Sequence, residues 1–160
     1  MSTNLINQAQ QFNYPKGHFD KERAAVVEQE RAKLANAVDM SKIFQIESSW
    51  KGDAHNVGED ARGLGQLRPP VLAEWNKNNE PKFTPDDLFN EDINAEIATW
   101  YMNDRIPNHY FKAWDIEDSI ENRILFYNAG PTEGRRRLKA GEAAPLSTQD
   151  YIRKYFGEGE

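Results

Sequence analysis

The stretch IFQIESSWKGDAHNVGEDARGLGQL, residues 43–67, joins an apolar helical run ending near one glutamate to a glycine-rich turn about twenty residues later. Helical residues three, four and seven positions apart share one face. Glu47 therefore lies within an apolar arc, which indicates that its carboxyl group faces the core or a cleft cut into it. The arc consists of Met40, Ile43, Phe44, Ile46 and Trp50.

The position of Glu47 predicts unusual acid–base behaviour. Removal from water disfavours the charged form of a carboxyl group and raises its pKa. Glu47 is then expected to keep its proton at neutral pH, as a general acid must when it protonates a glycosidic oxygen. The other interpretation is a buried structural ion pair with Arg23, Arg62 or Arg123, and helix phase alone does not decide between the two.

The composition indicates one domain with a polar surface. A chain of 160 residues, 29% of them charged, can bury one modest core. The lack of cysteine excludes disulfides and thiolate catalysis. Three scattered histidines, His18, His55 and His109, predict no metal site. The net charge of −6 disfavours nucleic acid as a partner, and Arg135–Arg137 is interpreted as the solvated face of a short helix.

Helical patterns dominate from Lys21 onward, so the predicted fold class is mostly α, with at most a small β-hairpin near residues 52–67. Residues 1–22 are expected to form an irregular N-terminal arm, and residues 23–160 the domain. No apolar run is long enough to span a membrane, and no signal peptide is evident. Helices are expected over residues 21–37, from Asp39 or Ser41 to Ser49, from Pro69-Pro70, from Asn90 or Asp92 to near Pro107, from about Ile116 to Gly130, over 132–140, and after a capping box at Ser147–Asp150, with residues 76–90 irregular.

Two further segments carry candidate site residues. In Gly63-Leu64-Gly65-Gln66, the glycines permit close approach of the backbone to a ligand, and the Gln66 amide suits a sugar hydroxyl or N-acetyl group. A plain tight turn would have the same pattern. Tyr127 and Asn128 end a predicted helix. Taken alone, Tyr127 is better interpreted as a core aromatic whose hydroxyl is bonded, and Asn128 could be a C-terminal capping residue.

Together these motifs resemble the soluble lytic transglycosylase (SLT) family, whose fold is related to that of goose-type lysozyme. A Glu-Ser pair closes a helix in that family, as Glu47-Ser48 does here, and a Gly-Leu-Met-Gln turn follows, as in Gly63–Gln66. The family's Asp-Leu-Phe-Asp-Pro…Asn-Ile stretch is similar to Asp87–Asn94, with Trp100-Tyr101 at the place of an aromatic pair. Its Tyr-Asn-Ala-Gly motif is matched by Tyr127–Gly130.

The resemblance implies a single lysozyme-like domain with a substrate groove for peptidoglycan glycan strands. It implies cleavage of the β-1,4 bond between N-acetylmuramic acid and N-acetylglucosamine, with formation of a 1,6-anhydro ring and no cofactor. One glutamate acts first as acid and then as base in this reaction. The residues implied are Glu47 as the catalyst, with Ser48, Gly63, Leu64, Gln66, Tyr101, Tyr127 and Asn128 contacting substrate.

Departures from the family pattern leave alternatives open. Gly65 replaces the usual methionine, which is expected to remove an apolar groove wall, and Ser147 replaces a late glutamate. Asp60 lies thirteen residues after Glu47, a spacing similar to that of a second acidic residue in goose-type lysozymes. Asp60 is therefore the candidate second carboxylate of a hydrolytic muramidase. A non-catalytic wall-binding virion protein is a further alternative.

The place of action is an expectation of the same resemblance. Peptidoglycan lies outside the cytoplasm, and no export signal is evident. A bacteriophage protein would explain how an enzyme without an evident export signal reaches peptidoglycan. It would be carried in the virion beside other virion proteins, or be released to the periplasm at lysis. A periplasmic enzyme whose leader has been removed is the other possibility.

Overall fold

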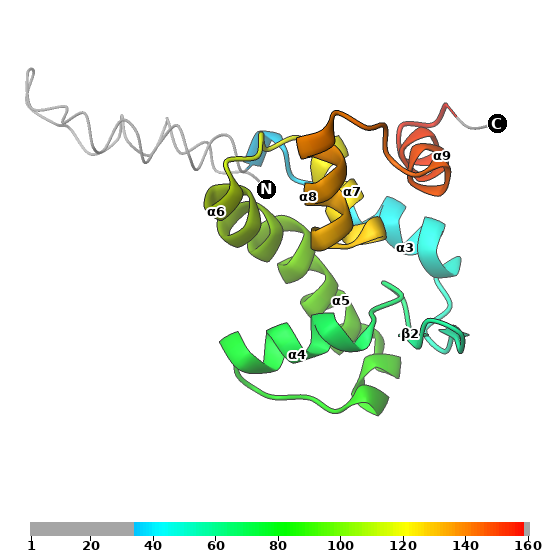
Figure 1. The fold of residues 1–160 in the computed structure, drawn as a ribbon. Coiled ribbons are helices and arrows are strands. Elements are labelled where there is room, and N and C mark those ends of the chain that lie inside the picture. Colours follow the sequence, from blue (N-terminus) through cyan, green and yellow to red (C-terminus); the bar gives the residue numbers. More distant parts are fainter. Residues whose placement is uncertain (1–33, 159–160) are drawn as a thin grey trace, which may run out of the picture.

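The computed structural model describes residues 34–158, which are mostly helical and include one small hairpin, as predicted (Figure 1). The expected arm over residues 1–22, and the expected helix over 21–37 up to residue 33, lie outside the described residues. In the described part of the chain, no helix is long and apolar enough to cross a membrane.

Helix α3, Met40–Ser48, begins as predicted, because the side chain of Asp39 accepts a hydrogen bond from the Ser41 amide. Met40, Ile43 and Phe44 are buried. The prediction that the apolar arc extends to Trp50 is wrong. The backbone turns left-handed after Ser48, at a φ of 53° for Ser49, and Trp50 is 49% exposed.

The predicted hairpin is present. Strand β1, His55–Asn56, pairs antiparallel with β2, Ala61–Arg62, so that His55 lies opposite Arg62. The hairpin lies between α3 and helix α4, Pro69–Asn78, which starts at the predicted prolines. The prediction of an irregular segment over residues 76–90 is partly wrong. Helix α4 continues to Asn78, and a short 3₁₀ helix, η1, spans Pro85–Phe89 behind a capping box of Thr84 and Asp87.

Helix α5, Glu91–Trp100, is capped by Asn90, as predicted. The prediction that it ends near Pro107 is wrong. The chain continues as a π-helix, η2, Tyr101–Phe111, and then as α6, Lys112–Trp114. A π-helix has wider turns and a shifted hydrogen-bond pattern, which accommodate a proline ring and its missing N–H.

Helix α7, Ile120–Ala129, forms the centre of the core and packs against η2, α8 and α9. It starts four residues later than predicted, because the Ser119 hydroxyl caps it by accepting from the Asn122 amide. Helix α8, Pro131–Ala140, follows at once, as predicted. The last helix, α9, is Leu146–Tyr155; it begins behind Pro145, so the predicted capping box at Ser147–Asp150 is wrong.

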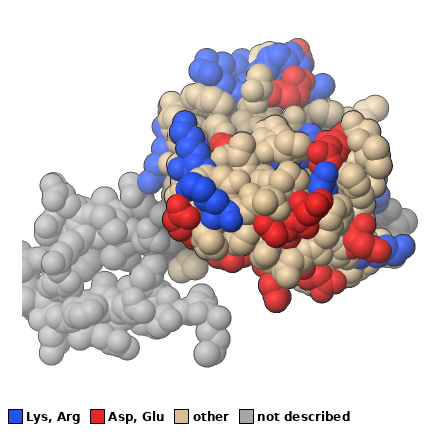
Figure 2. All heavy atoms as spheres, turned by 90° about the horizontal axis from the view of Figure 1, so that it is seen from below, with Lys and Arg blue, Asp and Glu red and all other residues tan. Residues whose placement is uncertain are grey.

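The arginine cluster on α8 is only partly a solvated helix face, because Arg136 is exposed whereas Arg135 and Arg137 are half-buried. Arg136 and Arg137 both pair with Glu133, at 2.7 and 2.8 Å, and the Arg135 guanidinium lies 4.5 Å from the centre of the Trp114 ring. On the face drawn in Figure 2, basic side chains form separate groups at the top and on the left, and acidic side chains lie mainly over the centre, on the right and along the lower edge.

Candidate active site

Glu47 lies in the last turn of α3 and lines a cavity of about 140 Å³. Residues far apart in the chain meet there: the end of α3, the hairpin, the glycine-rich turn and the end of α7. Most of the lining side chains are polar or charged, as in a site that binds hydroxyl and amide groups. The lining residues are Glu47, Asn56, Glu59, Ala61, Gln66, Arg68, Tyr127 and Asn128.

Burial raises the pKa of Glu47 from its ordinary value of 4.5 to about 7. The Tyr151 hydroxyl donates a hydrogen bond to Glu47 Oε2 at 3.2 Å, which favours the charged form and partly offsets that effect. The positive charge of Arg68 acts in the same direction as Tyr151, and the negative charge of Glu59 acts against it. The carboxyl group thus holds its proton up to neutral pH, as predicted from the apolar arc.

The interpretation of Glu47 as half of an ion pair with Arg62 or Arg123 is wrong. Arg62 pairs with Asp60 and Asp86, each at 2.9 Å. The buried Arg123 pairs with Asp118 at 2.7 Å. Arg23, the third candidate partner, lies outside the described residues.

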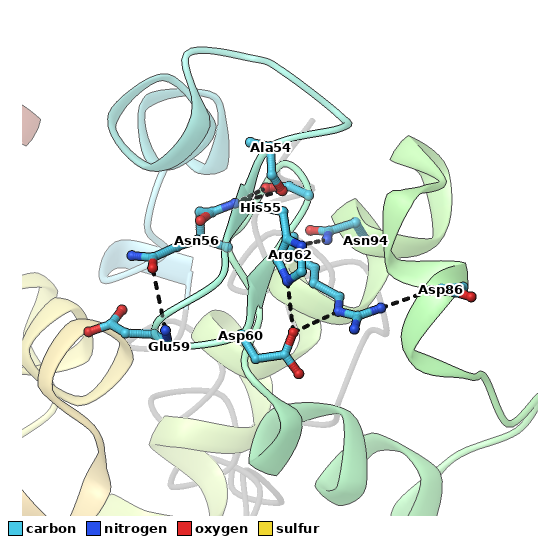
Figure 3. Close-up of polar contacts among 10 residues, drawn as sticks. Ala54, His55, Asn56, Glu59, Asp60, Arg62, Asp86 and Asn94 are labelled. Carbon is cyan, nitrogen blue, oxygen red and sulfur yellow. Dashed lines mark hydrogen bonds and ion pairs between the residues drawn. The ribbon is translucent and has the colours of Figure 1, made fainter.

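The turn at Gly63–Gln66 is held from two sides. A Cβ on Gly63, whose φ is +73°, would lie 2.2 Å from the Leu88 carbonyl oxygen, so only glycine fits. Asn94, fully buried on α5, accepts from the Gly65 amide at 2.8 Å and donates to the Leu88 carbonyl at 2.8 Å. It also donates to the Arg62 carbonyl at 2.8 Å (Figure 3). Asn94 was not predicted as a site residue. Its role depends on contacts about thirty positions away, which helix periodicity does not reveal.

The expectation that Gly65 removes an apolar groove wall is wrong. A Cβ on Gly65 would point into the protein, 2.7 Å from the Tyr127 hydroxyl oxygen and 2.9 Å from Ala98 Cβ. The Tyr127 hydroxyl donates to the Gly65 carbonyl at 2.7 Å. Glycine at this position therefore lets α5 and α7 approach the turn, and does not widen the groove.

Gln66 lines the cavity, but the fold already uses part of its hydrogen-bonding capacity. Its amide nitrogen donates to the Ala54 carbonyl at 3.1 Å and to the Gly63 carbonyl at 3.0 Å. Both amide hydrogens are thus used by the fold. The carbonyl oxygen of the side chain is the atom that Gln66 can offer to a sugar.

The predicted substrate-binding residues fall into two groups. Gln66, Tyr127 and Asn128 line the Glu47 cavity. The others are buried behind it: Ser48 donates its hydroxyl to the Phe44 carbonyl at 3.0 Å, and Gly63, Leu64 and Tyr101 are buried. For these buried residues, direct contact with substrate stays a prediction. In the structure they pack in the interior and do not line the Glu47 cavity.

Asp60, the predicted second carboxylate, lies outside the Glu47 cavity. Its Oδ1 is 2.8 Å from His55 Nε2 and accepts from Arg62 Nε at 2.9 Å (Figure 3). These bonds lower the pKa of Asp60. Asp60 instead borders a separate, largely apolar cavity of about 230 Å³ beside α4 and η1. Its neighbour Glu59 is the acidic residue that shares the cavity with Glu47.

Sequence reasoning also missed Arg68 and the role of Tyr151. Arg68 Nη2 donates to the carbonyls of Tyr127 and Asn128, both at 3.3 Å. Tyr151, on α9, was not predicted as a site residue, yet its hydroxyl bonds to Glu47 from 104 positions away. Among residues 34–158, no group of histidine and acidic side chains could hold a metal ion.

A mostly helical domain in which a protonated glutamate faces a polar cavity has the features expected of the class of lysozyme-like glycan-cleaving enzymes. Comparison with known families makes this specific. The transglycosylase SLT domain matches residues 25–148, so the chain belongs to that family and is a peptidoglycan lytic transglycosylase, as the motifs predicted. No curated protein and no solved structure matches the chain.

The raised pKa of Glu47 implies that the free energy of unfolding depends on pH. The folded state keeps this proton between pH 4.5 and about 7, where an unfolded glutamate has lost it. The contribution of Glu47 to the free energy of unfolding therefore falls as pH rises through this window, and stays unfavourable above it. Glu47→Gln, which cannot ionise, should be more stable than the wild type at about pH 8, by on the order of 2 kcal/mol.

Urea unfolding of both proteins at about pH 4 and about pH 8 measures this difference. The gain in stability should be absent at the lower pH, where both side chains are neutral. A gain of equal size at both pH values would mean that the ionisation of Glu47 is not its cause.

Proposed function

We propose that Glu47 is the single catalytic carboxylate of this transglycosylase and that the enzyme releases 1,6-anhydromuramic ends. The observation that carries the proposal is the pKa of about 7 for a glutamate on the wall of a polar cavity. Such a group is protonated often enough to act as an acid near neutral pH, and ionised readily enough to act as a base afterwards.

The reaction then runs in two steps. Glu47 gives its proton to the bridging oxygen, the bond from that oxygen to C1 of N-acetylmuramic acid breaks, and N-acetylglucosamine leaves as an alcohol. The N-acetyl group of the muramic residue stabilises the developing positive charge at C1. Ionised Glu47 next takes the proton of the C6 hydroxyl, whose oxygen bonds to C1. The glutamate ends as it began, protonated.

The cavity walls support this sequence. The Gln66 carbonyl oxygen and the Asn128 amide can orient hydroxyl or N-acetyl groups of the sugar. Asn128 is itself fixed, because the buried Thr148 hydroxyl donates to its Oδ1 at 2.6 Å. Tyr127 holds the glycine-rich turn in place through the hydrogen bond from its hydroxyl to the Gly65 carbonyl. A rigid wall limits the loss of orientation on the path to the transition state.

The competing function is a hydrolytic muramidase with Asp60 as the base for water. The bonds of Asp60 to His55 and Arg62, and its place on another cavity, do not favour this role. Digestion of purified peptidoglycan in heavy-oxygen water separates the two reactions. Ring closure by the C6 oxygen incorporates no label, whereas hydrolysis labels each new reducing end. Abundant labelled reducing ends would overturn the proposal.

We also propose that the enzyme acts on the wall as a bacteriophage protein, either from the virion at entry or after release at lysis. The support is the substrate of the family, peptidoglycan, which lies outside the cytoplasm. Probing purified virions for the protein tests entry, and timed inhibition of lysis in infected cells tests release. Its presence in uninfected periplasm, and in neither phage setting, would contradict the proposal.

A further inference from the structure

Two charged side chains of opposite sign share the cavity wall with Glu47. Glu59 comes from the hairpin turn between β1 and β2. Arg68 comes from the segment that caps the start of α4. They reach one cavity of about 140 Å³ from two parts of the fold, and each interacts electrostatically with Glu47.

Glu59 is an exposed side chain on a supported turn. Its backbone amide donates to Asn56 Oδ1 at 3.4 Å, and Asn56 lines the same cavity (Figure 3). Its negative charge disfavours a second negative charge on Glu47. Because Glu59 is in contact with solvent, this repulsion should weaken with salt.

Arg68 is a fixed, partly buried cation. Its Nη2 donates to two carbonyls in the last turn of α7, those of Tyr127 and Asn128. A guanidinium stays protonated at any working pH. Its positive charge favours the ionised form of Glu47.

The other titratable groups that face Glu47 do not change charge near neutral pH. Tyr151 on α9 and Tyr127 on α7 both have a pKa raised by burial, so both stay neutral. Among the described residues that act on Glu47, Glu59 and Arg68 thus carry the charges.

We propose that Glu59 and Arg68 are positioning residues with opposed effects, Glu59 favouring the acid form of Glu47 before bond cleavage and Arg68 favouring its base form afterwards. The inference rests on the proposed function, in which one carboxylate serves both steps. Glu59 alone would shift Glu47 towards its protonated form, and Arg68 alone would shift it towards its ionised form. The pair keeps both forms of Glu47 accessible near the working pH.

The test is the pH dependence of kcat/KM on soluble glycan strands, which reports the ionisation of the free enzyme. Glu59→Gln should move the alkaline midpoint to lower pH, and Arg68→Gln should move it to higher pH. Each shift should be roughly half a pH unit, the size expected for one unit charge in a partly solvated cavity. For Glu59→Gln, the shift should shrink at about 1 M salt.

Two matched variants control for structure. Asp60→Asn changes the neighbouring carboxylate outside the cavity, and should leave the midpoint unchanged. Arg68→Lys keeps the positive charge while altering the bonds to α7, so its midpoint should lie close to that of the wild type, without most of the shift seen with Arg68→Gln. Circular dichroism and thermal unfolding identify any variant that fails to fold.

The outcomes separate this inference from the proposed function. An active Glu47→Gln variant would overturn the proposed function. An inactive Glu47→Gln variant, with unmoved midpoints in folded Glu59→Gln and Arg68→Gln, would overturn the inference alone. Shifts of the same sign in those two variants would also overturn it, since opposed charges must act in opposite directions.

Discussion

Glu47→Gln should lower the rate of peptidoglycan solubilisation by roughly 10²–10⁴-fold, the range measured for loss of a general acid–base group. Glutamine has nearly the same size and can still accept from Tyr151, but it cannot give a proton to the leaving oxygen. Loss of turbidity of purified sacculi, followed at equal protein concentrations, measures the effect.

The chain offers a matched control in Glu74→Gln. Glu74 is also a half-buried glutamate with a tyrosine partner, since Tyr110 donates to its Oε1 and Arg105 donates at 3.2 Å. It does not line the Glu47 cavity. This variant should clear sacculi at close to the wild-type rate. Clearing by Glu47→Gln at the wild-type rate would instead point to another catalyst or to a non-catalytic wall-binding role.

Gly63→Ala should destabilise the protein by about 3 kcal/mol or more. The added Cβ would meet the Leu88 carbonyl oxygen at 2.2 Å and Asn94 Nδ2 at 2.4 Å. Neither atom can move away freely, because Asn94 is fully buried and is hydrogen-bonded to both the Gly65 amide and the Leu88 carbonyl. Urea unfolding gives the change in the free energy of unfolding.

Gly141→Ala is the control for backbone strain alone. Gly141 has a φ of +68°, close to the +73° of Gly63, but nothing lies within 4 Å of its would-be Cβ. This variant should cost only about 1 kcal/mol, the penalty for an L-residue in left-handed backbone. Equal losses in the two variants would mean that the contact with Leu88 and Asn94 does not constrain the turn.

Local features of the fold could be predicted because the residues that cause them are adjacent in the sequence. Asp39 caps the helix that carries Glu47, and the prolines at 69 and 70 open the next one. The phase of α3 alone indicated that Glu47 faces inward. Pro107 misled the prediction, because the chain continues through it as a π-helix, which packs against α7.

Site features formed by distant residues could not be predicted. Tyr151 bonds to Glu47 only because α9 packs on α3. Glu59 and Asp60 are neighbours in the chain but line different cavities, and the backbone at Asp60 is left-handed, with a φ of 51°. Sequence spacing favoured Asp60 because it does not encode the conformation of a turn.

The proposed mechanism depends most on the proton of Glu47. Carboxyl-carbon NMR of the folded protein, with Glu47→Gln used to assign the signal, follows the titration of this one group directly. The mechanism requires a midpoint of about 7. A midpoint near the ordinary value of 4.5 would contradict it, because Glu47 would then be ionised before substrate arrives and could not donate the proton that breaks the glycosidic bond.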